Sequence, residues 1–112
     1  LANELLVLIQ QMYHIERSML FIGLIDVISS MEQNLTEFII LAEDTTHLLA
    51  PLNFLTRLTK LADAKNIPHI YACKKKQLGQ ACHVFTNIIS AISIRTGPSY
   101  FSEEIKKIKC TI

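Results

Sequence analysis

The chain has few of the residues that mark several protein classes. Its 112 residues include only three glycines, three prolines and three cysteines. So little Gly and Pro excludes the collagen-like and proline-rich linker classes. Three cysteines cannot all pair with one another, so we expect a reducing intracellular compartment. No apolar run approaches the roughly 20 residues of a membrane helix, so no membrane-spanning segment is expected. No basic region precedes the first apolar run, so no secretory signal is expected either.

The sequence also lacks the motifs that accompany catalysis. It contains no P-loop, no G-x-G-x-x-G, no H-E-x-x-H and no nucleophile elbow. Cys73, Cys82 and His83 are of metal-ligand type, but they lack paired C-x-x-C units, so ordinary half-buried cysteines are the simpler interpretation. We therefore expect no enzyme activity, no metal and no cofactor.

What the chain does contain is enough apolar sequence for a core. Half of the residues are hydrophobic and 19% are charged, which fits one domain over residues 1–112. Helical periodicity predicts helices over residues 4–16, 24–32, 47–64 and 75–82, and from about residue 102. Short apolar runs predict buried strands over residues 38–42, 67–72 and 88–94. Helices that alternate with buried strands indicate an α/β sandwich.

Positive charge is nearly absent from the first half of the chain. The net charge is +1, from 11 Lys and Arg against 10 Asp and Glu, which disfavours a histone-like or basic-tailed protein. Residues 1–56 hold seven acids and one base, Arg17, whereas residues 57–112 hold ten bases and three acids. Any contact with an anion is therefore expected to draw on the second half.

Five strings carry a resemblance to a known protein family. The blocks LLVLIQQ, FIGLIDV, TEFIILAEDT, AKNIPHIYA and KKQLGQACHV begin at Leu5, Phe21, Thr36, Ala64 and Lys75. On these blocks the chain resembles the kink-turn-binding ribosomal and small-ribonucleoprotein family over about residues 4–109. The last block is the most specific and looks like the nucleolar and spliceosomal core branch, while FIGLIDV is closer to the SECIS-binding branch.

The resemblance implies both a fold and a function. The implied fold is α/β, a three-layer α-β-α sandwich around a four-stranded mixed sheet. The implied function is that of a non-catalytic RNA-binding subunit of a ribonucleoprotein, which grips a bent, kink-turn-type RNA and presents a joint surface to scaffold proteins. The expected location is the nucleus or nucleolus, or the ribosome in the cytoplasm. Neither a membrane nor a small-molecule substrate is expected as a partner.

The resemblance also implies where the RNA lies. The family surface joins the start of the second helix, the loop after the first long strand and the loop before the last strand. Gly23 and Asp26 would meet the bent RNA, and Lys75 would contact a phosphate. The expected RNA-binding residues are Gly23, Ile25, Asp26, Glu43, Asp44, Lys75, Val84, Phe85 and Thr86. Of these, Val84 and Phe85 would cover an extruded base.

The chain departs from the family pattern at this surface. Ile25 stands where the family has an Asn that reads a base edge, and Ile can neither donate nor accept a hydrogen bond. Phe21, Ile22 and Ser29 stand where the family carries basic residues, and Thr86 stands where it carries an Arg. Each lost contact costs about 1–3 kcal/mol of binding. The resemblance therefore implies the fold more strongly than the RNA site.

Two functional hypotheses remain open from the sequence. The first is the structural RNA-binding subunit described above, with its basic contacts shifted from the family positions. The second is a relative that has kept the fold and moved to protein–protein recognition. In that case Ile22, Leu24 and Ile25 would form an apolar contact patch where RNA lies in relatives.

Overall fold

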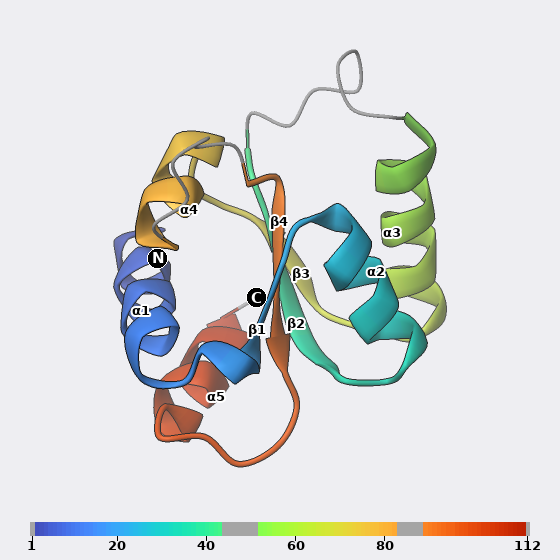
Figure 1. Cartoon of the computed structure of the whole chain (residues 1–112). Helices are drawn as coiled ribbons and strands as arrows, with labels where there is room; N and C mark the ends of the chain where they lie inside the picture. Colours follow the sequence, from blue (N-terminus) through green and yellow to red (C-terminus); the bar gives the residue numbers. More distant parts are fainter. Residues whose placement is uncertain (1, 44–51, 83–88, 112) are drawn as a thin grey trace.

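A computed structural model describes residues 2–43, 52–82 and 89–111. The sheet has the strand order β1-β4-β2-β3, with β3 parallel to β2 and the other pairs antiparallel. Helices cover both of its faces (Figure 1), so the expected three-layer α-β-α sandwich around a four-stranded mixed sheet is confirmed. The elements are α1 (Ala2–Ile15), η1 (Arg17–Met19), β1 (Leu20–Ile22), α2 (Leu24–Glu32), β2 (Thr36–Leu41), α3 (Leu52–Ala64), β3 (His69–Tyr71), α4 (Lys75–Ala81), β4 (Ala91–Arg95) and α5 (Ser102–Thr111).

The central strand β2 is apolar on both faces because each face is covered by helices. Phe38 and Ile40 belong to the core on the side of α1, α4 and α5, and Ile39 and Leu41 to the core on the side of α2 and α3. All four side chains are fully buried. This explains why β2 is a continuous apolar run in the sequence instead of alternating with polar residues.

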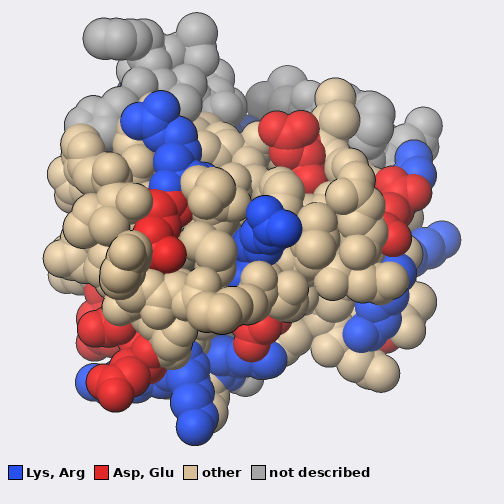
Figure 2. Space-filling view, turned by 60° about the horizontal axis from the view of Figure 1, so that its bottom comes forward, with Lys and Arg blue, Asp and Glu red and all other residues tan. Residues whose placement is uncertain are grey.

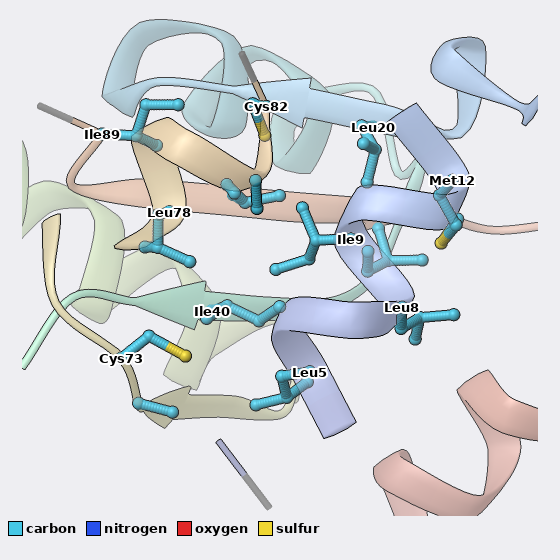
Figure 3. Close-up of a cluster of buried hydrophobic side chains, with 14 of the residues drawn as sticks. Leu5, Leu8, Ile9, Met12, Leu20, Ile40, Cys73, Leu78, Cys82 and Ile89 are labelled. Atoms are coloured by element: carbon cyan, nitrogen blue, oxygen red, sulfur yellow. The ribbon is translucent and has the colours of Figure 1, made fainter. Parts of the chain in front are cut away.

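The larger core lies on the α1 side of the sheet. Figure 3 shows Leu5 and Ile9 of α1 and Leu78 of α4 around Ile40, with Met12 farther along α1 in the same core. The four-residue spacing in α1 places Leu5 and Ile9 on one helical face. Burying an aliphatic side chain of this size contributes about 1.5–3 kcal/mol, so these contacts fix α1 and α4 on the sheet.

A small polar cluster is buried on the α2 side. Ser30 Oγ donates to the carbonyl oxygen of Val27 at 2.7 Å and lies 2.8 Å from Thr36 Oγ1, which accepts from Ser93 Oγ at 3.2 Å. Ser30 and Ser93 are buried. Three hydroxyls that satisfy one another in this way join α2, β2 and β4 at a fixed register.

Most predicted elements are present, but their limits differ. The helices over 4–16, 24–32, 75–82 and from 102 are confirmed within two residues. The predicted helix over 47–64 is described from Leu52 as α3, because positions 47–51 lie outside the described residues. The structure has β3 at His69–Tyr71, so the predicted strand 67–72 began too early. It has β4 at Ala91–Arg95, so residues 89–90 of the predicted strand 88–94 precede the strand, and residue 88 lies outside the described residues. Pro68 has no N–H to donate to the sheet, although its carbonyl oxygen accepts from Ile39 N at 3.0 Å.

The strand β1 was not predicted from the residue pattern. It is only three residues long and merges with the apolar start of α2, so no periodicity separates the two. Gly23 makes the separation, and β1 pairs with β4 along Leu20↔Ile94 to Ile22↔Ile92. Within the described part of the chain, no helix is long and apolar enough to cross a membrane.

Candidate functional site

The start of α2 presents open hydrogen-bond donors. Gly23 has φ +97° and ψ 156°, a conformation that is essentially restricted to glycine. Its N–H donates to the carbonyl oxygen of Ala91 at 2.9 Å, and its own carbonyl oxygen accepts from Val27 N at 2.9 Å. Val27 N is the first N–H group that donates within the helix. The N–H groups of residues 24–26 precede it, so they have no acceptor within the helix. Such a helix start attracts phosphate and other oxygen acceptors.

The side chains at this helix start are of mixed character. Ile25 is 70% exposed, Asp26 beside it is exposed, and Ile22 and Leu24 are partly exposed. Asp26 lies in the first turn, where a carboxylate is favourable to the helix dipole. The exposure of Ile25 means that packing within this chain does not explain the apolar residue at this position.

The end of β2 is hydrogen-bonded to two neighbouring loops. Ala42 N donates to the carbonyl oxygen of Ser90 at 2.9 Å, and Glu43 N donates to the carbonyl oxygen of Cys73 at 2.9 Å. Together with the Gly23 to Ala91 hydrogen bond, these contacts bring three segments to one end of the sheet (Figure 1, top). This end, called the upper end below, comprises the start of α2, the end of β2 and the start of α4.

Two lysines at the start of α4 belong to the upper end. Lys74 Nζ lies 3.8 Å from Glu43 Oε2 across the two loops, and both side chains are exposed. Lys74 N donates to Gln77 Oε1 at 2.8 Å, which satisfies one donor at the start of α4. Lys75 follows directly and is partly exposed. An exposed ion pair is worth no more than about 1 kcal/mol, so an anionic ligand can compete for Lys74.

The buried cysteines of this region are held as thiols. Burial raises the pKa of Cys82 to about 11. Burial, and then the Glu43 carboxylate, raise the pKa of Cys73. Neutral buried thiols are poor nucleophiles and poor metal ligands. Among the described residues no group of three His, Cys, Asp or Glu side chains could hold a metal ion, and His83 lies outside those residues.

The structure places five of the nine residues expected at the RNA surface at the same end of the sheet. Gly23, Ile25, Asp26, Glu43 and Lys75 all lie at the upper end. Lys74 is not one of these nine residues. The sequence shows only that it opens a run of three lysines, Lys74 to Lys76, and its contact with Glu43 depends on the loop after β3. The other four expected residues, Asp44, Val84, Phe85 and Thr86, lie outside the described residues.

Comparison with known proteins defines first the class of the fold and then the family. The chain superposes on the Giardia lamblia 15.5kD RNA binding protein with a TM-score of 0.81, over 98% of this chain and 85% of that one, at 20% identity. A model of the ribosomal protein L7Ae/L30e/S12e/Gadd45 family matches residues 10–100. The chain belongs to this family.

Curated relatives match along nearly the whole chain. The 13 kDa ribonucleoprotein-associated protein of Yarrowia lipolytica is 30% identical over 109 residues, which cover 97% of this chain and 82% of that protein. The NHP2-like protein 1 of Rattus norvegicus is 29% identical over 113 residues, which cover 100% of this chain and 83% of that protein. The family resemblance inferred from the five sequence blocks is thereby confirmed.

Proposed function

We propose that this chain is a non-catalytic RNA-binding subunit of a ribonucleoprotein, and that residues 1–112 form one kink-turn-binding-like domain. Its partners are a structured RNA and the scaffold proteins of the particle, in the nucleus or nucleolus or at cytoplasmic ribosomes. Family membership and the ribonucleoprotein-associated relatives support this proposal. The observation that carries it is the open first turn of α2 at the same end of the sheet as Lys74 and Lys75.

The upper end can bind RNA by three kinds of contact. The N–H groups of residues 24–26 donate to phosphate or base oxygens, and the Asp26 carboxylate accepts from a guanine amino group. Lys75, with Lys74 beside it, supplies positive charge to a phosphate. We propose that Glu43, Asp44 and Thr86 lie in the contacting loops. By the same proposal, Val84 and Phe85 cover an extruded base.

Titration with RNA tests the proposal. We expect a kink-turn RNA to bind more tightly than a straight duplex of the same length and composition, at both low and moderate salt. Ile25→Asn should tighten kink-turn binding by about 1–3 kcal/mol, because it introduces a side chain that can pair with a base edge. Val7→Asn, which also replaces an exposed aliphatic side chain by an amide but lies on α1, is the matched control. Equal affinity for the two RNAs at both salt concentrations would refute the proposal.

The exposed apolar residues at the start of α2 favour a second candidate function, a protein-interaction module. Ile25 is 70% exposed and lies beside the partly exposed Ile22 and Leu24. In this case a purified complex with a protein partner should survive nuclease treatment and dissociate in Ile25→Asp. A nuclease-resistant complex that Ile25→Asp leaves intact would count against this function.

A further inference from the structure

A charged cavity lies at the other end of the sheet from the upper end. It has a volume of about 580 Å³ and is bounded by the starts of β2 and β3, the end of β4 and one face of α5. We call it the basal pocket, and the residues that matter to the argument are Glu37, Arg95, Ser102, Lys106, Lys109 and Cys110. Strand β4 begins at Ala91, whose carbonyl oxygen accepts from Gly23 N, and ends at Arg95 in the pocket. The length of the strand therefore separates the two sites by about 13 Å.

The lining of the basal pocket has an excess of positive charge. Three cations face one carboxylate, and Lys109 Nζ lies 2.7 Å from Glu37 Oε1. A register shift between Thr36 and Phe38 inserts Glu37 as an extra residue in β2, and such a bulge re-aims a side chain. The bulge thus explains how the Glu37 carboxylate reaches Lys109 of α5 although the next residue, Phe38, is buried in the core.

Two cations of the pocket remain uncompensated. Arg95 and Lys106 are exposed, and neither takes part in an ion pair among the residues that the structure describes. Figure 2 shows the corresponding face of the molecule, where Lys and Arg side chains lie among acidic ones. The face is therefore not uniformly basic, and the excess positive charge is a local property of the pocket lining.

We propose that the basal pocket binds a backbone phosphate of the RNA whose bent part is held at the upper end. This inference rests on the proposed function. The guanidinium of Arg95 can pair with two phosphate oxygens at once, and Lys106 adds a point charge. Contacts of this kind position an RNA without reading its sequence. The start of α2 has no basic side chain at Phe21, Ile22 or Ser29. The basic second half of the chain provides the phosphate contact through the pocket instead.

The salt dependence of RNA binding tests this inference. The slope of log K against log salt is negative, and each phosphate contact that is lost reduces its magnitude by about 0.7–0.9. We expect this decrease for Lys106→Ala and for Arg95→Ala, with either a kink-turn RNA or a straight RNA duplex as the probe. Lys106→Arg should keep the slope. Lys107→Ala is the matched control, because Lys107 is exposed on the same helix but lines a groove against α1.

A thiol in the pocket provides a second, independent measurement. Cys110 lines the pocket and is exposed, whereas Cys73 and Cys82 are buried. An alkylating reagent should therefore label the native chain at Cys110, as peptide mass spectrometry can verify. We expect saturating RNA to slow this labelling severalfold. An unchanged labelling rate at saturation would overturn the inference.

The results separate this inference from the proposed function. Tight kink-turn binding with equal salt slopes in Lys106→Ala and Lys107→Ala overturns phosphate binding in the basal pocket and leaves the proposed function standing. Equal affinity for kink-turn and straight RNA, with a shallower salt slope in Lys106→Ala but not in Lys107→Ala, overturns the kink-turn function and supports phosphate binding in the pocket.

Discussion

Gly23 is the residue on which the geometry of the upper end most depends. Its φ of +97° and ψ of 156° are strained for any residue with a Cβ, although a Cβ there would meet no atom within 4 Å. Gly23→Ala should therefore lower the free energy of unfolding by about 1–3 kcal/mol through backbone strain alone. Urea unfolding measures this change. Ser29→Ala on the exposed face of the same helix is the control and should change stability by less than about 0.5 kcal/mol.

Ser30 offers a comparison between neighbouring serines. Ser30 is 1% exposed and its hydroxyl bonds Val27 and Thr36, whereas Ser29 is exposed and its hydroxyl accepts from Gln33 Nε2. Ser30→Ala should cost about 1–3 kcal/mol, because it removes a buried hydroxyl that bonds both Val27 and Thr36. Chemical unfolding of Ser30→Ala and Ser29→Ala side by side gives the difference. Equal stabilities would show that the buried hydroxyl cluster contributes nothing.

Cys82 gives a pH dependence whose sign can be worked out. Its pKa rises from an ordinary value of 9.0 to about 11 in the folded chain, so both states hold the thiol proton at lower pH. Between these values the unfolded thiol ionises first, and the free energy of unfolding falls by up to about 1.4 kcal/mol per pH unit. From pH 9.0 upward, wild type should therefore lose more stability than Cys82→Ala. Parallel pH profiles would contradict this assignment.

Among the helices and strands, those that bury a long apolar surface could be predicted from the sequence. Strand β2 and helix α1 were predicted because a long apolar run and a four-residue period report the surfaces they bury. Strand β1 was not predicted, because three residues are too few to show a hydrophobic period and its partner β4 is about 70 residues away in the chain. The same reason applies to the upper end, where the contact between Lys74 and Glu43 depends on tertiary structure and not on spacing.

The start of α4 provides a prediction at this scale. Gln77 Oε1 accepts from Lys74 N at 2.8 Å and so satisfies a donor that the helix cannot. Gln77→Ala should destabilise the chain by about 0.5–2 kcal/mol and increase amide exchange at the start of α4. Gln80→Ala, also exposed and on the same helix, is the control. If the two variants behave alike, the side chain of Gln77 does not hold the helix start.

For the whole molecule, the uneven charge acquires a structural meaning. The acidic first half supplies the start of α2 and the end of β2, and the basic second half supplies α4 and the α5 lining of the basal pocket. The sequence could show the split and, through the family resemblance, the upper end. It could not show the pocket, because Arg95, Lys106 and Glu37 meet only when β2, β4 and α5 pack together.

The central claim is that the open first turn of α2 binds RNA, and residue-resolved amide hydrogen exchange tests it most directly. The N–H groups of Leu24, Ile25 and Asp26 have no acceptor within the helix, so in the free chain they should exchange quickly. A kink-turn RNA should slow exchange at these three amides, while a straight duplex should slow it much less. Saturating kink-turn RNA that leaves all three amides at their free rates would contradict the account.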